Sequence, residues 1–418
     1  MEFNKFKLKE LLQVNPRMTL KKGSKAKKIA MENIKEFQKK IDNFTIEEFK
    51  SGSKFQNGDT LLARITPCLE NGKTAYVDIL EDDEIAFGST EFFVLRPIDN
   101  KLDSQFLYYL FRTKKVREII IKSMTGTSGR QRAQKDSILE YKCEVPTIEY
   151  QRKIAIILKN LDDKIEINKK IIANLEELSQ TLFKRWFVDF EFPDENGNPY
   201  KSSGGKMIDS ELGKIPNDWK ISNFQEITAF NTEIIDTNQL ENPLNYIGLE
   251  HISRNNIISI DRWENTSKVT GKKLKVCKGD ILFGKLRPYF QKVGISPIDG
   301  VVSTDIMIFT PSFKNVYYFI LLYLSQKNFI RYITSTSTGT RMPRTGKKQI
   351  NSYKIVLPTN LILTSFNTIL NRYTDLIKLL INENAKLIQL RDTLLPKLMS
   401  GEIEIPDDIE VNNDELSI

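Results

Sequence analysis

Residue groups that could do covalent chemistry are present in this 418-residue chain, but each is incomplete. Asn198-Pro199-Tyr200 lacks the second proline of an Asn-Pro-Pro-Tyr amine-methylation motif, and no glycine-rich turn for a methyl donor accompanies it. Gly339–Lys347 has six residues between its glycines where a phosphate-binding loop has four. Lys348 also occupies the place of the magnesium-binding Ser or Thr. We therefore predict that neither motif is catalytic.

The remaining acid-base candidates are isolated residues. His251 is the only histidine, and Asn33 occupies its place in the other repeat of the chain, so no repeated base exists. Asp42, Glu48 and Lys50 could be arranged into a nuclease pattern, but scattered carboxylates usually form a solvated face. The sequence predicts no catalytic residue and no metal site.

Basic residues fall where loops are expected, close to glycines. Such loops can carry arginine into a DNA groove, where the guanidinium forms a forked bond to guanine. A single loop charge is often only solvated, but this set recurs at the same places in both halves. We predict DNA contacts from Lys21, Lys22, Lys25 and Lys27 in the tract around Gly23, from Arg130, Arg132, Arg341 and Arg344, and from Arg64, Lys73, Lys285, Arg287 and Lys292.

The charge balance also favours a polyanionic partner. The formal net charge is +8, although residues 401–418 carry seven acidic and no basic side chains, so the rest of the chain carries +15. Nucleic acid is the simplest partner for such a surplus. The acidic tail itself is predicted to be a solvated terminus.

Two long helices are expected to position these loops. From Ile154 to Trp186, mainly apolar residues alternate at spacings of four and three, which indicates a coiled-coil seam. A shift of 212 gives a second seam from Phe366 to Leu398. Other landmarks repeat in the same order, such as Thr125-Gly126-Thr127 and Thr338-Gly339-Thr340. The chain is therefore predicted to be an internal duplication.

The two helices should run antiparallel, because the second must return for the seams to meet. Seams aligned end to end pair positions whose numbers sum to 552, so Asn168 and Asn384 should face each other. A polar pair in an apolar seam costs stability but specifies register. The alternative is two unrelated amphipathic helices, each packed on its own domain.

The predicted fold class is α+β, with two mixed globular domains joined by the antiparallel coiled-coil helices and related by a pseudo-twofold axis. In the first domain we expect strands at Tyr76–Ile79 and Phe92–Leu95. One helix is expected at Phe106–Ile121, with Leu107, Leu110 and Phe111 on one face. The predicted boundaries are 1–145 for the first domain, 146–188 for the first spacer helix, 189–216 for a linker, 217–357 for the second domain, 358–400 for the second spacer helix and 401–418 for the tail.

Composition suggests a cytoplasmic protein. No run of 18 apolar residues occurs, and the first residues lack the apolar segment of a signal peptide. Cys68, Cys143 and Cys277 lie far apart without a CxxC pair, so neither a disulfide framework nor a cysteine zinc site is indicated.

Several long motifs resemble those of type I restriction-modification specificity subunits, and the resemblance covers essentially the whole chain. The first half matches in specific motifs, whereas the second recognition domain matches mainly in layout. The matching segments are Ser51–Phe55 with Gly58–Lys73, Phe87–Phe92, Met124–Arg132, Phe183–Phe190 and Leu394–Ile403.

The resemblance implies a non-catalytic subunit that binds two methyltransferase subunits and, through them, motor-endonuclease subunits. It implies that these partners bind S-adenosylmethionine, ATP and magnesium, and that this chain directs them to a two-part asymmetric site on double-stranded DNA. Two unequal readers would read different bases, and we expect those contacts in the segments that the halves do not share. These segments are 13–28 and 37–56 in the first half, and 233–245 and 253–276 in the second.

Two other classes of function are open from the sequence alone. A self-contained DNA methyltransferase or nuclease would need a cofactor loop and a complete catalytic motif. A scaffold that uses only the helix pair would never touch DNA. Methylation without partners would favour the first class, and an absence of salt-dependent DNA binding would favour the second.

Overall fold

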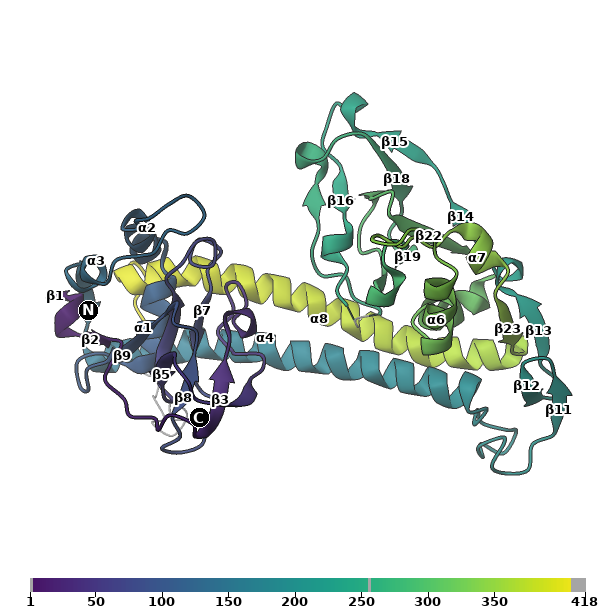
Figure 1. The fold of residues 1–418 in the computed structure, drawn as a ribbon, viewed down its shortest axis with the longest axis horizontal. Coiled ribbons are helices and arrows are strands. Elements are labelled where there is room, and N and C mark those ends of the chain that lie inside the picture. The colour runs from purple at the N-terminus through teal and green to yellow at the C-terminus, as the bar shows by residue number, and fades with distance from the viewer. Residues whose placement is uncertain (1–2, 255–256, 407–418) are drawn as a thin grey trace. The chain divides into compact units, whose positions relative to one another are not determined.

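The computed structural model describes residues 3–254 and 257–406, which form two compact units (Figure 1). Unit 1 contains the chain up to Glu166 and again from Ala385, and unit 2 contains Ile167–Asn384. Each unit therefore includes one part of each long helix, α4 (Ile148–Phe183) and α8 (Asn360–Ser400). Most of the acidic tail, residues 407–418, lies outside the described residues.

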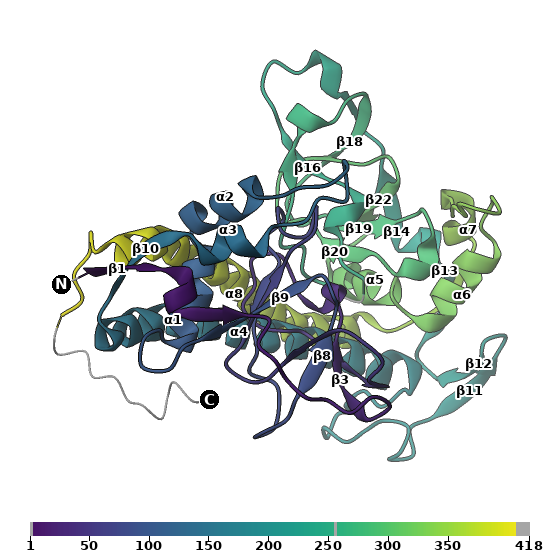
Figure 2. The ribbon, with the colours of Figure 1, turned by 60° about the vertical axis from the view of Figure 1, so that its left-hand side comes forward.

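Small sheets make up the globular part of unit 1. In one of them β3 (Lys25–Ile29) and β8 (Ala86–Gly88) are neighbours and run parallel (Figure 2). The outer strands β4 (Thr45–Glu48) and β5 (Ser53–Phe55) pair antiparallel with β3 and β8, respectively. The sheets are β1 (Phe3–Lys7) with β10 (Lys142–Pro146); β2 (Leu12–Val14), β9 (Phe92–Pro97), β6 (Thr60–Ala63) and β7 (Thr74–Tyr76); and β4 (Thr45–Glu48), β3 (Lys25–Ile29), β8 (Ala86–Gly88) and β5 (Ser53–Phe55).

The helices of unit 1 are α1 (Ser104–Arg112), α2 (Lys114–Lys122) and α3 (Lys135–Leu139), together with parts of α4 and α8. The expectation of one helix over Phe106–Ile121 was wrong. Thr113 is extended (φ −61°, ψ 142°), and its hydroxyl accepts a bond from the Val116 amide. Threonine caps a helix better than it continues one, so the chain ends α1 and starts α2 there.

The two strand expectations in this unit had different outcomes. Phe92–Leu95 is confirmed, because β9 contains it. The expectation of a strand over Tyr76–Ile79 was wrong beyond its first residue, since β7 ends at Tyr76. The amide of Val77 bonds the carbonyl of Asp59 in the turn before β6, so the ladder does not continue.

Unit 2 contains a similar set of sheets and helices. Its sheets are β13 (Lys220–Asn223) with β23 (Lys354–Leu357); β14 (Thr228–Asn231), β22 (Ile306–Pro311), β19 (Ile281–Gly284) and β20 (Val293–Ile295); and β15 (Ile234–Asp236), β18 (Lys272–Val276), β21 (Gly300–Val302), β16 (Asn245–Ile247) and β17 (Glu264–Asn265). Its helices are α5 (Tyr317–Tyr323), α6 (Lys327–Ser335) and α7 (Lys347–Asn351), together with parts of α4 and α8.

The strand pairings confirm the duplication. β16 pairs parallel with β21 as β3 pairs with β8, and the order β14-β22-β19-β20 repeats β2-β9-β6-β7. The edge strand β15 of unit 2 has no counterpart among the described residues of unit 1. The two units therefore share a scaffold but differ at one sheet edge.

The segment predicted as a linker, 189–216, contains regular structure. It follows a π-helical turn at Lys184–Val188 and forms a hairpin of β11 (Met207–Ser210) and β12 (Gly213–Pro216). Phe192 of this segment stacks on Trp219, with ring centroids 4.9 Å apart. The segment is thus fastened to unit 2 by apolar contacts that its Gly- and Ser-rich composition did not indicate.

The antiparallel helix pair and its register are confirmed within unit 2. Asn168 of α4 donates a 3.0 Å hydrogen bond from Nδ2 to Oδ1 of Asn384 in α8. Trp186 and Phe366, whose numbers also sum to 552, have ring centroids 5.6 Å apart. Both helices thus contribute their predicted seams, and the alternative of two unrelated helices was wrong.

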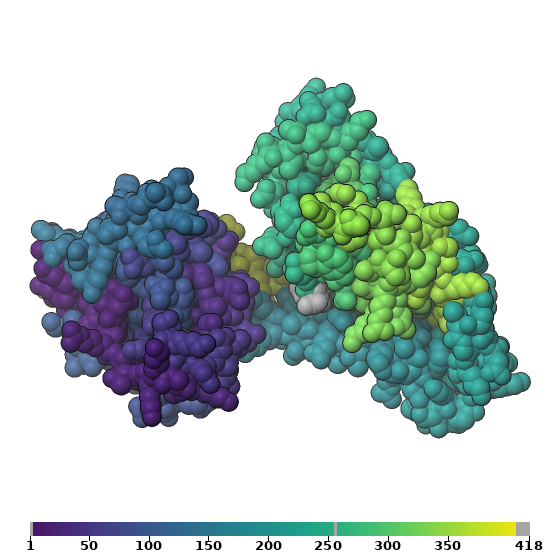
Figure 3. Space-filling view, viewed as in Figure 1, coloured from purple at the N-terminus to yellow at the C-terminus, as the bar shows by residue number. Residues whose placement is uncertain are grey.

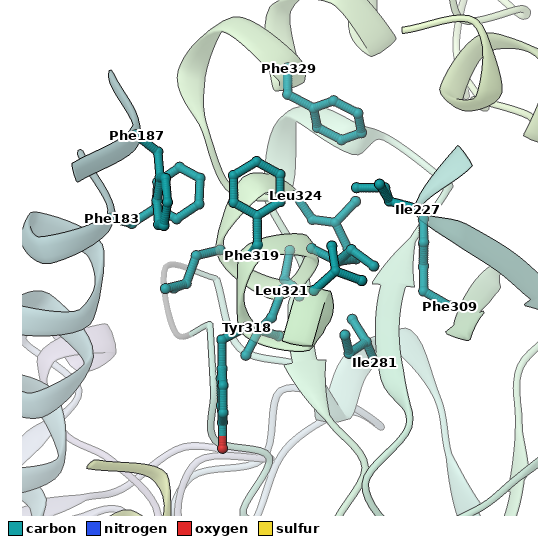
Figure 4. Close-up of a cluster of buried hydrophobic side chains, with 14 of the residues drawn as sticks. Phe183, Phe187, Ile227, Ile281, Phe309, Tyr318, Phe319, Leu321, Leu324 and Phe329 are labelled. Atoms are coloured by element: carbon teal, nitrogen blue, oxygen red, sulfur yellow. The ribbon is translucent and has the colours of Figure 1, made fainter. Parts of the chain in front are cut away.

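An aromatic cluster joins this helix pair to the rest of unit 2. Phe183, the last residue of α4, and Phe187 in the π-helical turn that follows lie 5.6 and 5.1 Å from Phe319 of α5, measured between ring centroids (Figure 4). Phe187 also meets Phe366 of α8 edge to face at 4.8 Å. Buried aromatic pairs of this geometry contribute beyond their area, so the cluster fixes the helix pair against the sheets of unit 2.

Candidate nucleic-acid interface

One arginine of each glycine-arginine loop, Arg132 in unit 1 and Arg344 in unit 2, forms an ion pair within its own unit. Arg132 forms a forked ion pair with Glu91, with its shortest N–O distance at 2.7 Å. This hydrogen bond, opposed by burial, holds the pKa of Glu91 below its ordinary value. In unit 2, Arg344 pairs in the same way with Asp305, from Nε to Oδ1 at 3.1 Å.

Backbone bonds around these pairs are also duplicated. The amide of Arg64 bonds the carbonyl of Glu91, and the amide of Lys285 bonds that of Asp305, both at 2.9 Å. The guanidinium of Arg64 lies 4.8 Å from the centre of the Phe93 ring, and its Nε is buried. Arg132 with Arg344, and the backbone amides of Arg64 with Lys285, thus make contacts that the two repeats share.

Lys73 and Lys292 have a second shared structural role. The ammonium of Lys73 donates to the carbonyl of Met31 at 2.9 Å, and that of Lys292 donates to the carbonyl of Leu249. Each carbonyl belongs to a short 3-10 helix, Met31–Asn33 or Leu249–His251. Burial lowers the pKa of Lys292.

Asn33 and His251 are equivalent in structure as well as in sequence. Asn33 Oδ1 accepts a 2.7 Å bond from the amide of Ala30, and His251 Nδ1 accepts a 2.9 Å bond from the amide of Gly248. Each side chain thus caps the 3-10 helix of its own unit. The lone histidine has a structural partner that accounts for its position.

The lysine tract around Gly23 is only partly a loop. Lys21 and Lys22 are exposed in a turn, but the expectation of a loop was wrong for Lys25 and Lys27, which lie in β3. Lys27 bonds Glu84 at 2.8 Å and is largely buried. Lys25 remains exposed.

Arg130 and Arg341 are the members of the two glycine-arginine loops that face solvent. Both side chains are exposed, and neither forms an ion pair within the described part of the chain. The loop of Arg341 joins α6 to α7, and this light-green part of unit 2 lies on the face turned to the viewer (Figure 3). Arg287 differs, since its backbone is left-handed (φ 51°) and its amide bonds the carbonyl of Pro343.

Both units are hollowed at the same place in the fold. In unit 1, a hollow of about 620 Å³ is lined by Asn15, Thr90 and Val94, among others. In unit 2, a hollow of about 310 Å³ is lined by their equivalents, Asn231, Thr304 and Ile308. A second hollow of unit 1, about 700 Å³, shares Gly52 and Thr90 with the first and carries Lys28 and Lys50.

Sequence reasoning missed three residues of this region. Glu91 and Asp305 were recognised only as landmarks, although an acid repeated beside a repeated arginine was a usable signal for an ion pair. Arg17 was not singled out, although it lies in a segment that the halves do not share. It is exposed on the wall of the 620 Å³ hollow.

The helix pair of unit 2 exposes an apolar face. Ile167, Ile171 and Leu178 follow helical spacing on α4, and Ile167 and Leu178 are each about half exposed (52% and 51%). On α8, Leu379 is 63% exposed. A row of such side chains is typical of a surface that a partner covers.

Within residues 3–254 and 257–406, no group of three His, Cys, Asp or Glu side chains is arranged to hold a metal ion. No helix in the same residues is long and apolar enough to span a bilayer.

The profile of one protein family matches this chain twice. The family is described as the type I restriction modification DNA specificity domain, and it matches residues 1–177 and 216–389. The two matches follow the internal duplication and cover most of the chain.

Individual proteins are similar over most of their length. The type I restriction enzyme MjaIX specificity subunit of Methanocaldococcus jannaschii is 27% identical over 316 residues, which cover 72% of this chain and 69% of that protein. The EcoDI specificity subunit of Escherichia coli is 25% identical over 342 residues, 74% of this chain and 72% of that protein. The crystal structure of a type I restriction-modification S subunit from M. genitalium covers 97% of both chains with a TM-score of 0.55 and 17% identity, a likeness of fold.

Proposed function

Since the chain belongs to the type I restriction modification DNA specificity family, we propose that it is the subunit that selects the DNA sequence for a type I restriction-modification complex. Its target is bipartite and asymmetric, and each recognition domain reads one half-site. The domains are 1–145 and 217–357, and the helices 146–188 and 358–400 act as spacers.

One observation carries this proposal: the units share a scaffold and a hollow, but not the segments around the hollow. The pairs Arg132–Glu91 and Arg344–Asp305 maintain the same framework in both units. Beside it, unit 2 has the extra strand β15 and unit 1 has an open loop. A common frame with different walls suits two readers of different short sequences.

The chain itself performs no chemical step in this proposal. Two methyltransferase subunits dock on the helix pair, and motor-endonuclease subunits join through them. S-adenosylmethionine, ATP and magnesium are bound by those partners. The exposed row of Ile167, Ile171 and Leu178 supports a docking role for the helix pair.

The decisive experiment is to co-express the chain with its methyltransferase partner and map methylated adenines across a genome. We expect a single asymmetric motif of two short sequences at a constant separation. Methylated sites without a common two-part motif would contradict the proposal.

The purified chain and its complex also distinguish the proposed function from its two alternatives. Methylation of DNA by the purified chain with S-adenosylmethionine, without partners, would establish a self-contained enzyme. A complex with methyltransferase subunits that shows no salt-dependent DNA binding would establish a scaffold. The proposal requires the opposite result in both measurements.

A further inference from the structure

The loop after β2 forms one wall of the hollow of about 620 Å³ in unit 1. Asn15 is left-handed (φ 55°), and its Oδ1 accepts a 2.9 Å bond from the amide of Val94 in β9. Pro16 follows and has no N–H to donate to a neighbouring strand. The chain therefore leaves the sheet at Asn15, and residues 16–19 rise as a wall beside the hollow.

The equivalent segment of unit 2 has a different structure. Asn231 occupies the place of Asn15, since it pairs with Ile308 at the strand position of Val94. The chain then continues into β15, which pairs with β18. Glu233 takes the sequence position of Arg17 and forms a 2.9 Å ion pair with Lys275. The wall of unit 1 thus has a cation where unit 2 has a neutralised carboxylate.

The wall is held in place around Arg17. The ammonium of Lys54 donates to the carbonyl of Met18 at 2.8 Å. The guanidinium of Arg96, forked onto buried Asp59 at 2.6 and 2.7 Å, touches the Met18 sulfur at 3.1 Å. A loop ordered before binding loses less entropy when it meets its ligand.

Among the residues of this wall, Arg17 is the one whose side chain takes no part in these contacts and can bind a ligand. Its side chain is exposed, and it forms no ion pair or side-chain hydrogen bond within the described residues. Its fork geometry matches N7 and O6 of guanine in the major groove. The neighbouring hollow is lined by Lys28 and Lys50 together with Glu47 and Glu48, and Lys28 pairs with Glu47 at 3.0 Å, so the base contact rests on Arg17 and not on this lining.

We propose that Arg17 is a specificity-determining residue of unit 1, and that it reads a guanine of the first half-site. Residues 16–19 enter the major groove and present the Arg17 guanidinium to the base edges. This inference rests on the proposed function, because it needs a DNA half-site for unit 1.

The test uses the full chain in complex with its methyltransferase partner. Methylation rates are measured for wild type and Arg17→Ala on a DNA library in which each position of the wild-type motif is varied. We expect discrimination to fall about 5- to 150-fold at one guanine of a single half-site. The other half-site and the gap should be unchanged.

Two further variants test whether the effect depends on position 17 and on the shape of the arginine side chain. Lys114→Ala removes a cation whose side chain is 91% exposed on α2 of the same unit, and should leave every preference unchanged. Arg17→Lys keeps the charge but loses the planar fork, so it should also lower discrimination at that guanine. Size-exclusion chromatography of each complex checks that the variants assemble.

Each remaining outcome is decisive. An equal loss of methylation at every sequence in Arg17→Ala, largely restored in Arg17→Lys, would make Arg17 a phosphate contact and overturn the inference. An unchanged motif in Arg17→Ala would also overturn it, while the proposed function would stand. The absence of any two-part motif for wild type would instead reject the proposed function.

Discussion

Asp162 of α4 and Arg391 of α8 form a buried ion pair in unit 1, with 2.6 Å between Oδ1 and Nη1 and side-chain exposures of only 5% and 6%. The hydroxyl of Tyr109 in α1 donates to the other oxygen of Asp162 at 2.8 Å. The shift of 212 places Thr374 and Ser179 at the corresponding positions. Where one repeat has a buried charged pair, the other has two buried hydroxyl residues, and Ser179 donates to the Leu175 carbonyl of its own helix.

Removing one member of this pair should be costly. Arg391→Met leaves the Asp162 carboxylate buried without its cation, and we expect a loss of about 3–5 kcal/mol in the free energy of unfolding. The double variant Asp162→Thr with Arg391→Ser copies the hydroxyl pair and should lose less than Arg391→Met alone. Urea unfolding of the three proteins measures this. Equal losses in the single and double variants would show that the charges are not coupled.

The facing asparagines provide a test of register. Asn168→Leu or Asn384→Leu alone leaves an amide in an apolar seam, and each should lower the midpoint of thermal unfolding. The double change to leucine should restore or raise it, with a coupling energy of about 0.5–3 kcal/mol. Strictly additive effects on the midpoint would argue that the side chains do not depend on one another.

Lys39 should make stability depend on pH. It is 3% exposed beside the rings of Tyr76, Tyr108 and Tyr109, and burial lowers its pKa from 10.5 to about 8. Because the unfolded chain then binds more protons between about pH 8 and 10.5, the stability of unit 1 should rise with pH across that window.

Lys39→Met should remove this rise and stabilise the protein at pH 7 by up to roughly 3 kcal/mol. Urea unfolding at pH 7, 9 and 10 measures both effects. Lys35→Met, which alters an exposed lysine nearby, should keep the slope of wild type. A slope that persists in Lys39→Met would assign it to another group.

The two arginines of the first glycine-arginine loop should behave differently. Arg130→Ala removes an exposed charge, so we expect binding to cognate and mismatched DNA to weaken about equally and the salt dependence to fall by about one unit. Arg132→Ala removes the ion pair with Glu91 and should loosen the loop. Fluorescence titrations of the assembled complex at several salt concentrations measure both. A changed base preference in Arg130→Ala would count against a phosphate role.

The exposed apolar face should be needed for assembly. Leu178→Glu with Leu379→Glu places charges on both helices of unit 2, and should weaken the complex with the methyltransferase subunits at least tenfold while leaving thermal stability nearly unchanged. Ile208→Glu, on the β11–β12 hairpin, is the matched control at 37% exposure. Analytical ultracentrifugation of the mixtures gives the affinity. Equal effects of the two variants would remove the helix face as the docking surface.

The helix pair was predictable because its information is periodic and local. The four-three spacing identifies each seam, and the duplication supplies the register that pairs Asn168 with Asn384. The break at Thr113 was harder to predict, because the apolar residues on both sides of it fit one continuous helix.

Composition and spacing were insufficient to predict which basic residues form ion pairs within the protein. Arg132 and Lys27 were predicted to contact DNA, and their ion-pair partners Glu91 and Glu84, which lie 41 and 57 residues away in sequence, were not foreseen. Ion pairs at such separations depend on strand order, which a single sequence does not reveal. Arg17 was overlooked for the converse reason, since its importance comes from the absence of a partner.

Unit 1 is built from two separate segments of the chain, and this has a consequence for biosynthesis. Leu395, Leu398 and Ile405 belong to its core, yet the ribosome makes all of Ile167–Asn384 before they emerge. At about 5–20 residues per second, this leaves the first domain without part of its core for on the order of 10 to 40 s. During that time Ile154 and Leu158 on α4 lack part of their final apolar cover. The nascent first domain is thus a natural client for chaperones, and its folding is completed only after translation has passed the second domain.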